Sequence, residues 1–517
     1  MTSPPSSVAQ RRTPLRGHPI ATLVAVSLGL FMVGLDATVV SIANPAIATS
    51  LNTSFVQLQW ITHAYLLGLA VCLILGGTLG DRFGRRRMYI VGVAAFAVSS
   101  IAIGLVGSAT GVIAFRAIQG ISAALLMPQT LSLLRATFSR EKFGMAVGIW
   151  GGVSSVAIAA GPIVGGALVA TLGWESIFFI NAPIAVFTIV FAALVIRESV
   201  AGTSSVRFDV PGVILLALGL AGLVLAIVQS EDWGWNDMRT IGLLVGALCV
   251  LALFVLVEGR SSHPLLPLTL FRERGFSIGG LAVAANFFAL LGVTFFLSLF
   301  LLNLRGVDGV TAGVMLLPLS AVSIIASPIG AILVSRIGPR ITMTVGLALV
   351  AVSLGALTFT GVDTPYVAMA VPFVTLALGV GLTMTAGADS IVGSAPVHLA
   401  GVAGGFQATM LQLGGALGTA VFAAVVGAGA ARESADLPLD HAQADALAQG
   451  IVPPGMSGAT AEAAQDAFLA GMHEAMLVGA IVTGAVALLA GTLLRRPGRH
   501  SADEVVLETL EGAVGAR

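Results

Sequence analysis

Long apolar runs recur along the whole of this 517-residue chain, and short polar or charged stretches separate them. A run of about 20 apolar residues, wound as an α-helix, crosses the hydrocarbon core of a bilayer. Only 10% of the residues are charged, against about 25% in a soluble domain, so the chain cannot cover a large water-soluble surface. We therefore predict an all-α integral membrane protein, because lipid leaves backbone groups no partners outside their own helix.

Charged and turn-rich breaks divide the chain into 14 predicted transmembrane segments. The segments are 20–45, 57–79, 88–107, 112–134, 144–170, 177–196, 210–229, 240–257, 276–303, 310–334, 341–361, 366–391, 401–428 and 474–494. If both termini are cytoplasmic, 21 of the 25 Lys and Arg residues lie on the inner side, and only Arg239, Arg305 and Arg432 lie outside. Cytoplasmic loops carry such an excess of basic residues, so we expect both termini to face the cytoplasm.

Two short stretches indicate an internal repeat. GGTLGDRFGRRR (76–87) follows the second segment, and GAILVSRIGPRI (330–341) follows the tenth. Transporters are often built from such repeats, with the substrate site between the two halves; a chance match over so short a stretch is the alternative. With Gly84 placed on Gly338, the identical pairs are Gly76 and Gly330, Leu79 and Leu333, Arg82 and Arg336, and Arg86 and Arg340.

The repeat predicts how the chain is divided. We expect a cytoplasmic N-terminal segment (1–19), an N-terminal six-helix bundle (20–196), a linker with two inserted transmembrane helices (197–275), a C-terminal six-helix bundle (276–494) and a cytoplasmic tail (495–517). Within the second bundle, residues 429–473 are predicted to form a polar, Ala-rich extracytoplasmic loop with room for short amphipathic helices.

The loop after the second segment combines an acid, arginines and glycines. Glycine allows a tight turn and a close approach of helices, and the helix dipole favours an acid near a helix N-terminus. We interpret the loop as a cytoplasmic gate that makes and breaks as the two halves rock. Alternatively, its arginines only fix the orientation and bind lipid phosphates. The candidate gate residues are Gly77, Gly80, Asp81, Arg82, Gly84, Arg85 and Arg86.

Asp36 is the only residue with a formal charge between Pro19 and Gly80. A carboxylate that faces lipid is unfavourable, so we expect Asp36 to face the central cavity, where it can bind and release a coupling proton. The alternative is a hydrogen-bonded aspartate that fixes helix packing, with Arg116 as its partner. Arg116 and Gln119 share one helix face and are candidates for proton handling, substrate polarity or a structural clamp. The polar residues His63 and Asn286, in otherwise apolar segments, complete this candidate set.

The fifth segment carries a stripe of small residues. Gly148, Gly152, Ser155, Ala159, Pro162 and Gly166 follow one another at alternating spacings of four and three. Such a stripe lets another helix pack very close, and a proline within a helix bends it. We expect a bend at a sliding interface, with ordinary small-residue packing as the alternative. The residues proposed for this motif are Gly152, Gly161, Pro162, Gly165 and Gly166.

GGTLGDRFGRRR, FRAIQG and AAGPIVGG resemble the signature motifs of the major facilitator superfamily, and the last resembles the motif of its exporters. LDATVV, QWITHAYLL, IFFINAPI and the 14 segments resemble the drug:proton antiporter family with 14 helices. The resemblance implies two six-helix bundles around a central cavity, in the cytoplasmic membrane of a bacterium. It also implies export of hydrophobic drugs or antibiotics, cationic ones included, in exchange for protons. Ser335 departs from the pattern, because an acid is usual there, so the second gate should be weaker.

Several other classes of function are disfavoured. The formal net charge is zero, which does not suggest a nucleic-acid partner. No GxxxxGK[ST] motif indicates an ATP site, and the two cysteines lie in separate apolar runs without a metal-binding pattern. We thus expect no cofactor, no metal and no enzyme activity, and a monomer that contacts membrane lipids, protons and a hydrophobic small molecule. A dedicated exporter of one endogenous product and a lipid or glycolipid translocator are the rival functions.

Overall fold

The computed structural model describes residues 16–494, apart from 54, 200–208, 235–236, 262–263, 435–436, 438–440, 453–455 and 457. All the regular secondary structure in these residues is helical, which confirms the predicted fold class. The N-terminal helices are α1 (Pro19–Leu51), α2 (Phe55–Phe83), α3 (Arg85–Leu105), α4 (Ala109–Thr137), α5 (Arg140–Leu172), α6 (Ser176–Phe179) and α7 (Asn181–Val195). The remainder are α8 (Val210–Trp233), α9 (Met238–Glu258), α10 (Arg274–Leu299), α11 (Gly309–Leu357), α12 (Tyr366–Ser394), α13 (Ala400–Glu433), α14 (His441–Ala448) and α15 (Ala459–Leu493). Most of the predicted N-terminal segment and the whole predicted tail lie outside the described residues.

Each of the 14 predicted segments coincides with helical backbone. Within the described residues, 11 helices are long and apolar enough to cross a membrane. The difference has two sources: α11 runs through the tenth and eleventh predicted segments as one helix, and the apolar parts of α5 (Lys142–Ile158) and α8 (Pro211–Ile227) are shorter.

The kink in α11 supports the internal repeat. Gly338 interrupts the helix with φ 83° and ψ 162°, and Gly84, its partner in the aligned repeat, separates α2 from α3 with φ 106° and ψ 125°. Only glycine adopts these angles without strain. The aligned arginines also act alike, since Arg86 donates to the Ala193 carbonyl and Arg340 donates to the Gly491 carbonyl. Each arginine thereby ties the loop to the last helix of its own half.

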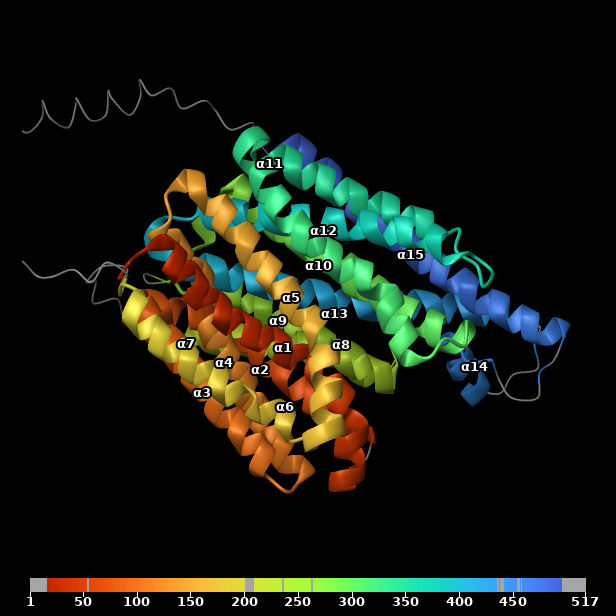
Figure 1. Ribbon diagram of the computed structural model, residues 1–517. Helices are drawn as coiled ribbons and strands as arrows, with labels where there is room; N and C mark the ends of the chain where they lie inside the picture. Colours follow the sequence, from red (N-terminus) through yellow and green to blue (C-terminus); the bar gives the residue numbers. More distant parts are fainter. Residues whose placement is uncertain are drawn as a thin grey trace, which may run out of the picture.

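Two bundles of helices form the molecule (Figure 1): α1–α7, in red to yellow, and α10–α15, in green to blue. Helix α8 packs against both α2 and α13, so the inserted pair begins between the bundles, and α9 packs mainly on α8. The outward side of α9 is apolar and exposed, as expected of a helix that faces lipid. Its exposed residues include Ile241, Val245, Leu248, Leu253 and Leu256.

The buried cores show that the two halves meet at one end only. One large apolar cluster combines both halves, with Leu73 and Ile74 of α2 beside Ala403 and Phe406 of α13. Further along the helices each half has a core of its own, one around Trp174 and Phe178 and one around Phe422 and Phe468. We call the end with the shared cluster the joined end, and the end where each half has its own core the separated end.

The predicted loop 429–473 is more helical than expected. α13 continues to Glu433, α14 covers His441–Ala448, and α15 begins at Ala459 rather than near residue 474. Leu447 and Phe468 are fully buried in the core of the C-terminal half at its separated end. Burial of these two apolar side chains holds the segment against the bundle, which the polar composition of the loop did not indicate.

Candidate functional site

Asp36 lies at the centre of a buried polar cluster in the N-terminal half. Its Oδ2 accepts a hydrogen bond from Arg116 Nη1 at 2.6 Å. Its Oδ1 accepts from Gln119 Nε2 and from Asn181 Nδ2, each at 3.0 Å. All three partners donate, as they would to an ionised carboxylate.

Several contacts also fix the guanidinium of Arg116, the partner of Asp36. Its Nε donates to the Ile61 carbonyl at 3.1 Å, and Nη1 also donates to Gln119 Oε1 at 2.7 Å. The guanidinium carbon lies 4.2 Å from the centre of the Tyr65 ring, a cation–π arrangement. The side chains of Asp36 and Arg116 are 0% and 1% exposed. The opposite charge and these hydrogen bonds make burial of the pair tolerable.

The expected direction of Asp36 was wrong. We predicted that the side chain faces the central cavity, whereas the structure turns it into the N-terminal bundle, toward α4 and α7. The pairing with Arg116, which the sequence offered as an alternative, is present. Since a buried charge is stabilised best by an opposite charge, Arg116 sets the direction in which Asp36 points.

Two members of the cluster were missed from sequence. Asn181 begins α7 and donates to Asp36, and Ser100 of α3 accepts from Gln119 Nε2 at 3.2 Å and from Asn181 Nδ2 at 2.9 Å. The only sequence signal was a polar residue in each apolar run, and such residues are often satisfied within their own helix.

The other two candidates of this set lie elsewhere. Asn286 is fully buried in the C-terminal half, where its Nδ2 faces the Val380 carbonyl at 3.4 Å, so it does not join the Asp36 cluster. His63 lies on α2 and packs edge-on against Trp60, with the ring centres 6.4 Å apart. The structure thus brings together Asp36, Arg116 and Gln119.

Asp81 forms the contact between the halves that the gate motif suggests. Its Oδ1 accepts from Arg85 Nε at 2.9 Å and Nη2 at 2.7 Å, and both the carboxylate and the guanidinium are nearly buried. Across the joined end, the backbone N–H groups of Gly401 and Val402 donate to Asp81 Oδ2 at 2.9 and 3.2 Å. These N–H groups begin α13, where the helix dipole favours a negative charge.

Glycines allow this close approach. A Cβ at Gly77 would collide with the Gly401 carbonyl, and one at Gly80 would collide with the amide of Gln129. A side chain at either position would separate α2 from the helices packed on it, so the glycine requirement at the gate is steric.

The arginines of the motif have different tasks. Arg85 pairs with Asp81, whereas Arg86 bonds within its own half and Arg82 is exposed and lies over the Phe83 ring. Glu198, which the sequence did not single out, accepts from the backbone N–H groups of Arg86 at 3.0 Å and Arg87 at 3.2 Å. It caps the first turn of α3 beside Gly84.

The small residues of α5 face two different helices. Near the joined end, a Cβ at Gly148 would come within 2.8 Å of Ala331 on α11, and Gly152 approaches the same helix. Farther along, Gly161 and Gly165 pack on Thr38 and Val39 of α1. Only the first part of the stripe therefore lies at the interface between the halves. For Gly166 no atom lies within 4 Å of an added Cβ in the described structure, and Pro162 lies within α5.

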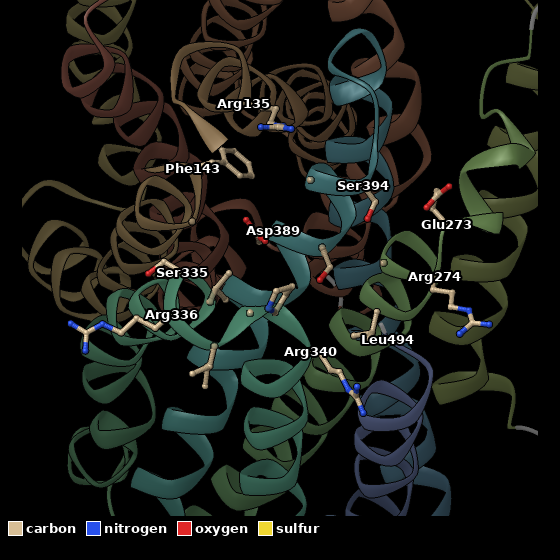
Figure 2. Close-up of a pocket in the computed structure, with 18 of the residues that line it drawn as sticks. Arg135, Phe143, Glu273, Arg274, Ser335, Arg336, Arg340, Asp389, Ser394 and Leu494 are labelled. Carbon is tan, nitrogen blue, oxygen red and sulfur yellow. The ribbon is translucent and has the colours of Figure 1, made fainter. Parts of the chain in front are cut away.

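A polar cavity of about 1010 Å³ opens at the joined end between α4, α5, α10, α11 and α12. Figure 2 shows Asp389 at its centre, with Arg135, Arg274, Arg336 and Arg340 around it. Ser335, which stands in register with Asp81, donates to the Ile332 carbonyl of its own helix rather than to another element. A serine at this position cannot supply the carboxylate that Asp81 supplies in the first loop.

Comparisons with known proteins agree with this architecture. The chain is 41% identical to the tetracenomycin C resistance and export protein of Streptomyces glaucescens over 97% of this chain and 96% of that protein. It is 32% identical to the multidrug efflux pump LfrA of Mycolicibacterium smegmatis, over 94% and 98% of the two chains. The structure of the proton:xylose symporter XylE superposes with a TM-score of 0.59 at 14% identity, over 91% and 95% of the chains. Residues 26–419 match the model of the Major Facilitator Superfamily, and the chain belongs to that family of transporters.

Proposed function

We propose that this transporter exports hydrophobic drugs or antibiotics across the cytoplasmic membrane in exchange for protons, by alternating access. The joined end, which carries the basic loops, is then cytoplasmic, and both termini lie on that side. The moving parts are the bundles 20–196 and 276–494, linked through 197–275. In this arrangement the two halves pack together on the cytoplasmic side.

The buried pair of Asp36 and Arg116 is the observation that carries the proposal. A carboxylate kept in a membrane span at the cost of desolvation indicates a function that needs a charge there. A proton that moves inward across the membrane releases about 2.3 kcal/mol per 100 mV. When Asp36 takes that proton, the pair loses its Coulomb attraction and the packing of α1 against α4 is altered.

Helix α5 offers a mechanical link from that pair to the gate. Thr38, two residues after Asp36, donates to the Ile158 carbonyl of α5 at 3.2 Å. Near its other end, α5 packs on α11 of the C-terminal half through Gly148. A displacement of α1 on protonation would therefore reach the interface between the halves through a rigid helix.

The relatives favour this substrate class, since several are named as multidrug or antibiotic resistance proteins. A dedicated exporter of one endogenous antibiotic is the second candidate, because the relative with 41% identity is named as an export protein for a single compound, tetracenomycin C. Resistance of a deletion strain separates the two functions. Sensitivity to many unrelated compounds favours the multidrug exporter, and sensitivity to one favours the dedicated exporter.

The decisive experiment is transport by the reconstituted protein. An imposed pH gradient should drive efflux of a fluorescent dye by the wild type and not by Asp36→Asn. Asp389→Asn, which changes another acid in a predicted span, should retain gradient-driven efflux. Undiminished efflux by Asp36→Asn, or loss only in Asp389→Asn, would remove Asp36 from the coupling role.

A further inference from the structure

The Asp36 cluster contains one acceptor that is not used. Asn181 is 1% exposed, its Nδ2 donates to both Asp36 and Ser100, and its Oδ1 has no hydrogen-bond partner among the described residues. A buried amide oxygen without a donor is unfavourable. Because such atoms are rare in native structures, this one calls for a physical explanation.

Gln119 and Ser100, the other neutral side chains of the cluster, already accept hydrogen bonds within it. Gln119 Oε1 already accepts from Arg116 at 2.7 Å, and Arg116 itself offers only donors. Ser100 Oγ accepts two hydrogen bonds and donates a third to the Phe178 carbonyl at 3.0 Å. The cluster thus satisfies an ionised Asp36, but a protonated Asp36 would bring an O–H donor that needs a new acceptor.

We infer that Asn181 is a positioning residue that serves both protonation states of Asp36. Its Nδ2 donates to the ionised carboxylate, as in the structure. When a proton binds Asp36 Oδ1, a half-turn of the amide about its Cβ–Cγ bond replaces Nδ2 with Oδ1, which accepts the new O–H. No heavy atom other than those of the amide has to move far, because the two ends of the amide have nearly the same shape.

This inference rests on the proposed role of Asp36 as the proton-binding residue. The charged or titratable groups that face Asp36 are Arg116 on α4 and, behind Arg116, Tyr65 on α2. Helices α3 and α7 present the neutral Ser100 and Asn181. The Tyr65 hydroxyl is also buried without a partner in the described structure, so it is the rival acceptor.

Infrared difference spectroscopy on the full-length protein in lipid nanodiscs tests the inference directly. On acidification, a carboxylic-acid band that is absent from Asp36→Asn should appear. With asparagine carrying ¹³C in its side-chain amide, a labelled amide band should shift over the same pH range, and Asn181→Thr should abolish that shift. An Asp36 band without any response of the labelled amide would overturn the inference. Absence of an Asp36 band at every accessible pH would instead contradict the proposed function.

Transport by a matched pair of variants gives a second readout. Thr and Val have nearly the same shape, but only Thr can both donate and accept. Asn181→Val should slow gradient-driven dye efflux about tenfold, the factor that corresponds to one lost hydrogen bond, while dye exchange without a gradient continues. Asn181→Thr should stay within about twofold of the wild type on the same scale, and so should Thr188→Val, a buried control on α7.

The alternatives are distinguished by the same assay. If Tyr65→Phe shows the loss expected of Asn181→Val, the hydroxyl is the acceptor and the inference is wrong. It is also wrong if Asn181→Val couples efflux to the gradient as the wild type does. Should Asn181→Val fail to fold, the infrared result with Asn181→Thr still decides.

Discussion

Neutralising Asp81 should shift the protein toward the state in which its joined end opens. Asp81→Asn removes the charge that holds Gly401 N–H and Val402 N–H, at 2.9 and 3.2 Å, across the interface between the halves. The ion pair with Arg85 lies within the N-terminal half, so we expect its loss to lower overall stability without favouring one state. Only the interaction with α13 depends on the state.

The size of the shift follows from that interaction. A hydrogen bond to a charged group contributes about 1.5–3 kcal/mol, and a charge at a helix N-terminus adds about 0.3–1 kcal/mol. Asparagine keeps one oxygen that can accept from these N–H groups, so the substitution removes only part of the interaction. We estimate the free energy lost at about 1.5–3 kcal/mol. This free energy corresponds to a change of about 10- to 150-fold in the ratio of the two states.

Distances between spin labels at exposed Ala136 on α4 and Arg336 on α11 measure the separation of the halves at this end. Cys72 and Cys249 are replaced beforehand so that only the introduced cysteines react. The Asp81→Asn distribution should gain a longer distance that is minor in the parent. Asp237→Asn, which removes a partly exposed acid that pairs with Arg239 away from the interface, is the control. Identical distributions for the parent and Asp81→Asn would refute a latch at Asp81.

Three further perturbations test other parts of the structure. Gly148→Leu should impair transport more than tenfold with normal membrane insertion, because even a Cβ there would come within 2.8 Å of Ala331; dye efflux measures it, and wild-type rates would contradict the packing of α5 on α11. Glu198→Gln should weaken the cap of α3 by about 1 kcal/mol, seen as a small drop in melting temperature, and an unchanged melting temperature would argue against the cap. Phe468→Ala removes a fully buried ring and should cost about 3–5 kcal/mol. The variant should be cleaved faster than the wild type by a protease between α14 and α15. An unchanged cleavage rate would mean that the ring does not anchor that segment.

The internal repeat shows how much of the structure can be predicted from local sequence. The apolar runs predicted the helices and the glycines predicted the breaks, because helix formation in lipid is satisfied within each segment. Gly84 and Gly338 both adopt positive φ, and the aligned arginines make equivalent contacts in their own halves. These features depend on residues that are close together in the chain, so they can be predicted from one sequence.

The functional site was only partly predictable. The isolated charge at Asp36 and the pair of Arg116 and Gln119 stand out because charges are rare in membrane spans. Their common cluster with Asn181, 145 residues from Asp36 in the chain, depends on which faces α1, α3, α4 and α7 turn toward one another. Helix periodicity cannot supply that information when every face is apolar, since the lipid-facing and core-facing sides then look alike.

The sequence by itself determined a helical membrane protein, its approximate segments and the residues too polar to face lipid. The tertiary structure decided that Asp36 turns inward to Arg116, that Asp81 binds the start of α13, and that the halves share a core at one end only. The physical reason is that hydropathy is a property of each segment, whereas the partner of a buried charge is chosen by the packing of helices distant in the chain.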